Sequence, residues 1–551
     1  MSQDLEGRVD SAQVDVIVQF NQLPTAAYHQ KVTSKGGSVK REFRQFKGGA
    51  YTIAASALAE LAADPDVVYI SPDRPVSGWG KSSQPVLIDY HAAAINAPAA
   101  WAEGLDGSGV GVAVIDSGIP LNSDLNFLKV VYSQDFTGAL LGSSADQYGH
   151  GTHVAGIVAG NGAQSTGSKF TYTFKGIAYN ANLINLRVLD QNGAGTDSDV
   201  IAAIDAAIFW RSAFNIRVIN LSLGRPVWES YKTDPLCQAV EQAWKAGIVV
   251  VVAAGNYGRD NNAGTDGYGT ITAPGNDPYV ITVGAMNTMG TPARTDDVIA
   301  SYSSKGPTLF DQVIKPDLVA PGNRIISLYN QGQTLSQENP GNEIPKSLYE
   351  TNNGAAASSA YFILSGTSMA APMVTGAAAL MLQQNPSLTP DQIKARLMKT
   401  AFKNLVQYDT AVDPATGIAY YDQADIFTVG AGYLDIEAAL ANTDLAPPAA
   451  GSALSPTAAV DSSGNIVLQV NGSSVLGGSS VLWGSSVLWG SSVLWGSDVS
   501  GESVLWGSNS LQGESVLWGS SEVQADSVLW GSSVLWGSTA LDPELAIYGD
   551  K

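Results

Sequence analysis

Between residues 101 and 441, short and almost continuously apolar runs alternate with helical segments, which limits the chain to one fold class. The runs are rich in Val, Ile and Ala and cover residues 111–115, 181–189, 218–223, 248–254 and 280–285. Helical patterns cover residues 154–160, 199–209, 234–246 and 369–384. Uninterrupted apolar strands are typical of a parallel sheet that is buried on both faces. The sequence therefore predicts an α/β domain with an open, mostly parallel sheet and helices on both faces.

Residues 1–78 are predicted to form a separate, small α+β domain. Strand-like runs cover residues 14–20, 50–54 and 67–70, and helical patterns cover 24–35 and 56–64. The domain has eight basic and nine acidic residues, whereas the whole chain of 551 residues has a net charge of −21. Its basic residues cluster in one segment, which is either a solvated face or a surface for an acidic partner: Lys31, Lys35, Lys40, Arg41, Arg44 and Lys47.

The C-terminal part of the chain is a repeat of low complexity. Residues 442–472 are rich in Ala, Pro, Ser and Gly and are predicted to be a linker. In residues 473–551, Ser-Val-Leu-Trp-Gly recurs seven times, at spacings of 6, 11 or 12 residues. In an extended chain a six-residue period places each Val and Trp on one face. The tail is therefore either a β-array, an aromatic stripe or an unstructured low-complexity segment.

Composition excludes several classes of protein. Charged residues are only 14% of the chain and form no basic stripe, so nucleic-acid binding is not expected. No apolar run approaches the ~18 residues of a membrane-spanning helix, and the first 25 residues contain no visible signal peptide. The single cysteine, Cys237, excludes an intrachain disulfide framework and is interpreted as a small buried hydrophobe.

Polar residues that can carry chemistry follow several of the predicted strands. Asp116 follows the first run, Ser222 to Gly224 end the third, and Asn256 follows the fourth. Because function gathers at the carboxyl ends of strands in open α/β sheets, these residues should meet at one edge.

Two of the four histidines and one serine lie at predicted helix starts. His150 and His153 belong to His-Gly-Thr-His-Val-Ala-Gly, and Ser368 opens an Ala-rich helix within Gly-Thr-Ser-Met-Ala-Ala-Pro. Amides at a helix start are suited to stabilising negative charge. A His-x-x-His pair can also bind zinc, but no further histidine or cysteine lies nearby in the sequence.

The segments around Asp116, His150 and Ser368 resemble the three signature blocks of the subtilisin-like serine protease (subtilase) family, in the chain order of that family. The resemblance covers about residues 85–441, and residues 14–75 resemble, less strongly, the family propeptide. It implies that Ser368 is the nucleophile, that His150 is the general base, and that Asp116 orients the imidazole. The repeat tail lies outside the family pattern.

The resemblance also implies the surroundings of the triad. The Asn256 side chain and the Ser368 amide would form the oxyanion hole, and His153 would be structural. Substrate would add as an antiparallel strand to two edges, where glycines leave room for its side chains: Ser222, Leu223 and Gly224, and Gly193 and Gly195. The primary specificity pocket would be lined by small residues: Ala253, Ala254 and Gly255. Catalysis needs no cofactor, and calcium is compatible as a structural ion, although no spacing identifies its ligands.

We therefore expect a serine endopeptidase made as a self-inhibited zymogen. Residues 1–78 would be the propeptide, residues 79–441 the catalytic domain, and cleavage would fall between residues 76 and 87. Its partners would be polypeptide substrates and its own propeptide, and we expect it to be secreted or on the cell surface. The tail would bind the cell surface or associate with itself. In the alternative interpretation, the chain is a surface-binding scaffold whose function is carried by the tail. The intact catalytic blocks favour the protease.

Overall fold

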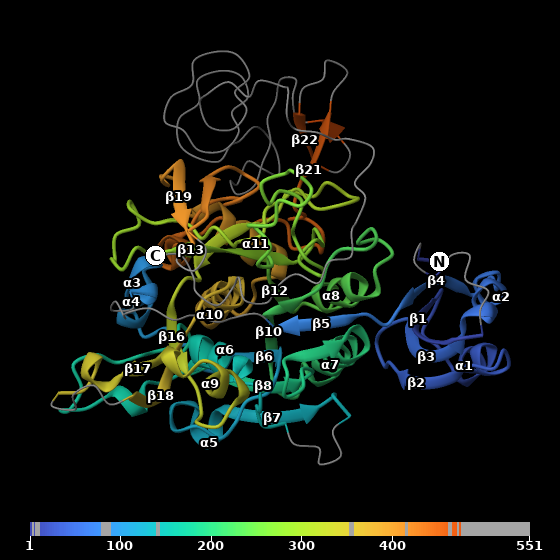
Figure 1. Ribbon diagram of the computed structural model, residues 1–551, viewed down its shortest axis with the longest axis horizontal. Coiled ribbons are helices and arrows are strands. Elements are labelled where there is room, and N and C mark those ends of the chain that lie inside the picture. Colours follow the sequence, from blue (N-terminus) through green and yellow to red (C-terminus); the bar gives the residue numbers. More distant parts are fainter. Residues whose placement is uncertain are drawn as a thin grey trace.

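The computed structural model describes residues 1–2, 5, 11–78, 90–138, 144–351, 357–413, 417–460, 466–470 and 473–474. In this part of the chain, a small N-terminal α+β unit lies beside a larger α/β unit (Figure 1). The Trp repeats and most of the expected cleavage region lie outside the described residues. Among the helices that the structure describes, none has the length and hydropathy to span a membrane.

The larger unit is built on an eight-stranded, mostly parallel sheet with the order β14-β13-β12-β10-β6-β8-β7, in which β15 also pairs with β13. Only the β13–β14 pair is antiparallel. The strands are β6 Gly111–Asp116, β7 Val130–Asp135, β8 Asn182–Arg187, β10 Ile216–Leu221, β12 Val249–Ala253, β13 Ile281–Asn287, β14 Val298–Ile299 and β15 Leu318–Pro321. The predicted α/β class is therefore confirmed.

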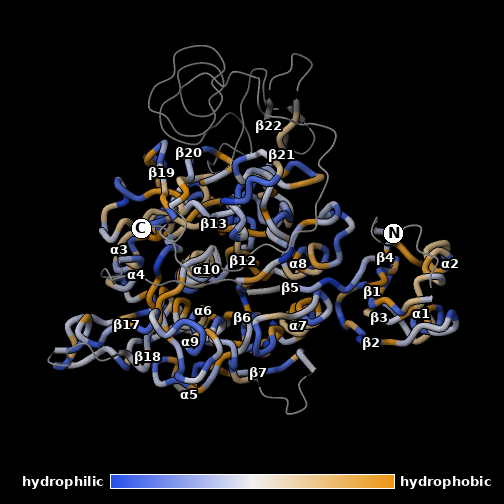
Figure 2. The backbone as a smooth tube through the Cα atoms, in the orientation of Figure 1, coloured by the Kyte–Doolittle hydropathy of each residue, from blue (hydrophilic) through white to orange (hydrophobic). Residues whose placement is uncertain are grey.

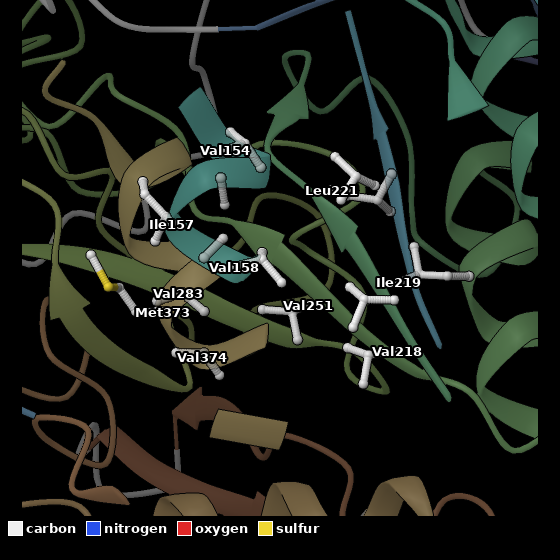
Figure 3. Packing of buried hydrophobic residues seen from close by; sticks show 14 of the residues in the cluster. Val154, Ile157, Val158, Val218, Ile219, Leu221, Val251, Val283, Met373 and Val374 are labelled. Atoms are coloured by element: carbon white, nitrogen blue, oxygen red, sulfur yellow. The ribbon is translucent and has the colours of Figure 1, made fainter. Parts of the chain in front are cut away.

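Helices cover both faces of this sheet (Figure 1). Helices α6 (His150–Ala159) and α10 (Thr367–Gln384) pack together on one face, and α7 (Asp197–Trp210) and α8 (Pro235–Lys245) pack on the other. Figure 3 shows apolar side chains of α6 and α10 directed at those of β10, β12 and β13. This packing holds the first turns of α6 and α10 close to the carboxyl end of the sheet.

The N-terminal unit is a four-stranded antiparallel sheet with the order β2-β3-β1-β4. Its elements are β1 Gln13–Phe20, α1 Ala26–Thr33, β2 Ser38–Glu42, β3 Gly48–Ala54, α2 Leu58–Ala62 and β4 Val67–Pro72. Hydrophobic residues of β1, β3 and the two helices form a core of their own (Figure 2). Other buried residues of the unit belong to the core of the α/β unit, so the two units share an apolar interface: Ile17, Phe43, Phe46 and Ala50.

Several elements were not predicted from the sequence. Strands β2 and β7 contain only exposed and half-buried positions, and α11 (Pro390–Thr400) has a polar composition. A separate antiparallel sheet has the order β16-β18-β17, with β16 Ile325–Leu328, β17 Glu343–Pro345 and β18 Ala357–Leu364. Further short elements are α3 His91–Ala94, α4 Ala97–Ala102, α5 Asn126–Lys129, α9 Thr334–Glu338, α12 Ile436–Ala441, β19 Tyr408–Val412 and β20 Ala419–Gln423.

The first part of the expected linker is packed against the α/β unit rather than free. Thr457, which begins β21 (Thr457–Val460), forms a β-bridge with Val313, and Ser455 is only 5% exposed. The Ser455 hydroxyl donates to Asp317 (2.6 Å), which also binds the buried amines of Lys315 (2.7 Å) and Lys394 (3.2 Å). Strands β22 (Ile466–Val470) and β23 (Ser473–Ser474) then extend the β21 sheet. Ser and Ala are as compatible with close packing as with a flexible chain, so the composition of residues 442–472 did not indicate these contacts.

Candidate active site

Asp116 and His150 meet at the carboxyl end of the central sheet. Asp116 is the last residue of β6, His150 is the first residue of α6, and both side chains are fully buried. The His150 Nδ1 atom lies 2.8 Å and 3.0 Å from the two carboxylate oxygens of Asp116. An ionised carboxylate only accepts hydrogen bonds, so His150 donates from Nδ1 and the imidazole orientation is fixed.

Ser368 lies in the first turn of α10, where it is bonded to the end of β10. Its hydroxyl donates to the Ser222 carbonyl (3.0 Å), and the Ser222 hydroxyl donates to the Ser368 carbonyl (2.8 Å). The Asn220 amide donates to the Ser222 hydroxyl in turn (2.9 Å). Among the described residues the Ser368 hydroxyl therefore binds Ser222 and not His150. Catalytic hydrogen bonds are often long or absent without substrate and form in the substrate complex.

Two unsatisfied donors lie beside Ser368. The Asn256 Oδ1 atom accepts from the Thr367 amide and hydroxyl, both at 2.9 Å, which turns the Asn256 NH₂ group the other way. That Nδ2 atom is buried without a hydrogen-bond partner in the described part of the chain. The Ser368 amide, second in α10, likewise finds no acceptor among the described residues. Buried donors without partners are rare, and such a pair is suited to an oxyanion.

The two predicted edges for substrate lie on either side of a strand from the N-terminal part of the chain. Strand β5 (Pro75–Gly78) runs antiparallel to β11 (Leu223–Gly224) and to β9 (Ala194–Thr196). In this register Ser77 lies opposite Gly224 on one edge and opposite Ala194 on the other. Figure 1 shows β5 leading from the small unit toward the central sheet. The chain therefore fills the groove between these edges with a segment of its own.

The glycines on these edges lie against other atoms of the protein. A Cβ atom at Gly193 would lie 2.5 Å from the Tyr148 ring, and one at Gly195 would lie 2.3 Å from the Val188 carbonyl oxygen. At Gly224 it would lie 2.8 Å from the Thr272 hydroxyl. The protein's own atoms fill the space beside each glycine, so these glycines permit close packing within the protein.

The three residues predicted to line the specificity pocket lie at the end of β12. Ala253 and Ala254 are 2% and 0% exposed, and Ala254 is bonded through its backbone to Val283 and Thr272. Gly255 has a φ of +107°, which is unfavourable for any residue with a side chain. The Asn256 side chain follows directly on this turn.

His153 is directed away from His150. Its Nε2 atom lies 3.1 Å from the carbonyl oxygens of both Ile325 and Phe362, on β16 and β18. An imidazole that donates to backbone carbonyls helps to hold α6 on the neighbouring sheet. The ring therefore has a packing function in this structure.

The N-terminal unit contacts the α/β unit mainly at α7. Asp73 accepts from the amide (2.7 Å) and hydroxyl (2.5 Å) of Ser198 in the first turn of α7, and Asp205 accepts from the backbone amides of residues 44–46. Arg41 donates to Asp199 (2.6 Å), and Arg74 donates to Glu229 (2.5 Å).

The basic segment of the N-terminal unit contributes less to this interface than its charge suggests. Lys31 and Lys35 form ion pairs with carboxylates of their own unit, and so does Lys40. Arg41 reaches a carboxylate on α7, and the Arg44 guanidinium stacks on Phe209. Hydrogen bonds and apolar contacts therefore supply most of the described contacts between the units.

Comparison with known proteins agrees with this geometry. The model of the subtilase family matches residues 107–432. The chain is 34% identical to subtilisin E of Bacillus subtilis (strain 168) over 405 residues, which are 73% of this chain and 88% of that protein. It is 41% identical to serine protease AprX of the same organism over 302 residues, and this match spans 53% of this chain and 61% of AprX.

A solved structure shows the same fold. Fervidolysin from Fervidobacterium pennivorans, described as a keratinolytic enzyme related to subtilisin, superposes with a TM-score of 0.57 and 22% identity. The match covers 80% of this chain and 62% of fervidolysin. With the family model matched over more than half of its length, the chain belongs to the subtilase family of serine proteases.

Proposed function

We propose that the protein is a serine endopeptidase that hydrolyses peptide bonds through Asp116, His150 and Ser368. The observation that carries this proposal is the pair of unsatisfied donors, Asn256 Nδ2 and the Ser368 amide, at the helix start that bears the serine. A protease needs such donors where negative charge develops on the attacked carbonyl oxygen. The Asp116–His150 hydrogen bond supports the same reaction.

The roles of the triad follow from its contacts. With Nδ1 held by Asp116, His150 accepts the Ser368 proton at Nε2 when the serine attacks the substrate carbonyl carbon. Asp116 stabilises the imidazolium that forms. His150 then gives the proton to the leaving amine, and the acyl group remains on Ser368 Oγ until water hydrolyses the ester.

Replacement of Asn256 by alanine should lower kcat by about 10²–10³, the effect known for the equivalent donor of subtilisin, with little change in KM. The physical reason is that Nδ2 would bind the oxyanion of the transition state more strongly than the substrate carbonyl. Steady-state hydrolysis of a chromogenic peptide measures both constants. Thr272→Ala removes a nearby hydroxyl outside the proposed oxyanion hole and serves as a control. A loss below tenfold in the Asn256 variant would contradict the assignment.

We further propose that residues 1–78 are a propeptide that inhibits the enzyme until it is cleaved. The position of β5 between β9 and β11, where a substrate strand would bind, supports this role. The buried Arg74–Glu229 ion pair and the Asp73 contact to α7 would keep this segment docked. Cleavage is proposed between residues 76 and 87, next to the strand that lies in the groove. Cleaved enzyme would then act outside the cell or at its surface.

The repeat tail is proposed to attach the enzyme to the cell surface or to other copies of itself. Deletion of residues 473–551 should leave folding and peptide hydrolysis unchanged, because Ser455 and Thr457 keep their contacts. It should change cell fractionation or sedimentation, since a tail with seven tryptophans offers an apolar surface. A tail of equal length with every Trp replaced by Ser separates this effect from chain length. An unchanged distribution and assembly state would eliminate the idea.

A further inference from the structure

We propose that Asp146 is a positioning residue for His150, holding the start of α6 and the end of β6 in the geometry that catalysis requires. The inference rests on the proposed function of the triad. Asp146 lies in the loop before α6, four residues from His150, and is 5% exposed. It touches neither Ser368 nor a substrate edge, so it would act through the residues that it binds.

The Asp146 carboxylate uses its full capacity as an acceptor. Oδ1 accepts from the Gly149 amide (2.7 Å) and the Ser117 hydroxyl (2.9 Å), and Oδ2 accepts from the Thr152 amide (2.8 Å) and hydroxyl (2.5 Å). Gly149 and Thr152 flank His150, so one rigid group fixes the backbone on both sides of the histidine. Because its two oxygens bind four donors, both the position and the rotation of the Asp146 carboxylate relative to this backbone are fixed.

The same carboxylate reaches Asp116 through Ser117. The Ser117 hydroxyl donates to Asp146 and accepts from the Gly151 amide (2.8 Å), while the Ser117 amide donates to Asp116 Oδ1 (2.7 Å). Ser117 therefore binds Asp116, Asp146 and the residue after His150. Through it, the loop before α6 is joined to the strand that carries the other half of the Asp–His pair.

A second side chain, that of Gln333, also binds the hydrogen-bond network of Asp146. Gln333, 4% exposed, lies just before α9, and its Nε2 atom donates to the Thr152 hydroxyl (2.7 Å) and to the Asp146 carbonyl oxygen (3.2 Å). Its Cβ atom lies only 3.3 Å from the position that a Cβ at Gly149 would take. Gln333 belongs to a segment more than 180 residues further along the chain than Asp146.

Burial destabilises the charged form of the Asp146 carboxylate, so a carboxylate at this position indicates a function. Desolvation raises the pKa of Asp146, while the hydrogen bonds from Thr152, Gly149 and Ser117 favour the charged form. No cation is among the described partners of the carboxylate. A displacement of about 1 Å at a reacting group can lower a rate by about 10². A rigid acceptor beside His150 prevents such a displacement.

The test compares Asp146→Ala, Asp146→Asn and Ser117→Ala with Asp391→Ala. Asp391 serves as a control because it is a buried carboxylate whose two oxygens also accept hydrogen bonds, from the Trp244 side chain (2.8 Å) and the Ala453 amide (2.7 Å), away from the site. Full-length chains are freed of the N-terminal unit by limited proteolysis, and active sites are counted with a fluorophosphonate. Rates are taken well below the unfolding temperature of each variant.

We expect Asp146→Ala to lower kcat per active site by about 10–100-fold with KM nearly unchanged. Asp146→Asn should recover only part of the loss, because its NH₂ group would face a backbone amide donor, of Gly149 or of Thr152, in place of one carboxylate oxygen. Ser117→Ala should show a smaller loss of the same kind, and Asp391→Ala should lower only the unfolding temperature. The downfield proton resonance of the His150–Asp116 hydrogen bond should shift or broaden in Asp146→Ala and not in Asp391→Ala.

The inference is overturned if kcat per site and this resonance in both Asp146 variants match those of Asp391→Ala. If Asp146→Ala does not fold, Asp146→Asn and Ser117→Ala decide the question by the same two measurements. Failure of the proposed function is distinguishable, because it would appear as full activity in Ser368→Ala. An inactive Ser368→Ala together with a normal Asp146→Ala would reject only the positioning role.

Discussion

Replacement of Ser368 by alanine should abolish peptide hydrolysis and leave the chain at full length. In subtilisin, loss of the nucleophile lowers kcat by about 10⁶, and we expect a similar loss here because no other described side chain is placed to receive the acyl group. Wild-type protein should react with a fluorophosphonate probe and lose a fragment of about 80 residues, the distance from residue 1 to the expected cleavage region. Ser368→Ala should neither react with the probe nor lose the fragment. Labelling and intact mass measure these two outcomes.

Ser165→Ala is a suitable control for this experiment. Ser165 is also fully buried and hydrogen-bonded, accepting from the Phe174 amide (3.0 Å), but it lies away from Asp116 and His150. This variant should label and process as the wild type does. Labelling of Ser368→Ala would show the triad assignment to be wrong. Wild-type protein that labels but stays intact would retain the protease proposal and reject self-processing.

Replacement of Asp317 by alanine should be the most destabilising single change that the structure suggests outside the active site. Asp317 lies between the amines of Lys315 and Lys394, and all three side chains are fully buried. Removing one member of a buried ion pair leaves an uncompensated charge and costs about 3–5 kcal/mol. Ser455 would lose the nearer of its two acceptors as well and keep only the Pro278 carbonyl oxygen (3.2 Å), which should loosen the segment that leads to the tail. Urea unfolding at pH 7 measures the loss of free energy.

The difference in free energy of unfolding between the wild type and Asp317→Ala should become smaller in acid. Burial alone raises the pKa of Asp317, but Lys315 and Lys394 outweigh it and hold the pKa below its ordinary value. A group whose folded-state pKa is lowered stabilises the fold above its unfolded pKa, of about 3.9, and loses that contribution as the pH falls through the folded value. The free energies of unfolding of the wild type and of Asp317→Ala should therefore approach each other only well below pH 4. Asp296→Ala, an exposed carboxylate, should change stability by no more than about 0.5 kcal/mol at any of these pH values.

The α/β class and the positions of the candidate site residues at strand ends and helix starts were predictable because their signals are local. A run such as residues 248–254 can be stable only inside a buried sheet, and Asn256 must then lie at the strand end. One missed helix, α11, also had a local signal. Thr389 and Gln392 form a capping box at its start, a pattern visible in the sequence.

The remaining features depend on contacts between distant residues and left no periodic signal. The positioning role proposed for Asp146 depends on its contacts with Ser117 and Gln333, which are distant in the sequence. Ser455 likewise contacts Asp317 across 138 residues. The close packing at the glycines of the predicted substrate edges could not be read from the sequence for the same reason. Glycine in a sequence indicates a close approach, but Tyr148 and Thr272 could be identified as the approaching groups only from the structure.

The strand β5 has a consequence for which proteins this enzyme can cut. It is bonded to a neighbour on each side, β9 and β11, so a substrate that takes its place, as proposed, must offer backbone with both edges exposed over about four residues. A folded target does not offer such a stretch, since its strands and helices already use those groups. Access would then require local opening of the target, whose free energy is close to zero in frayed ends and reaches the global stability in a core. The order in which targets are degraded would therefore follow their local unfolding equilibria more closely than their residue preferences.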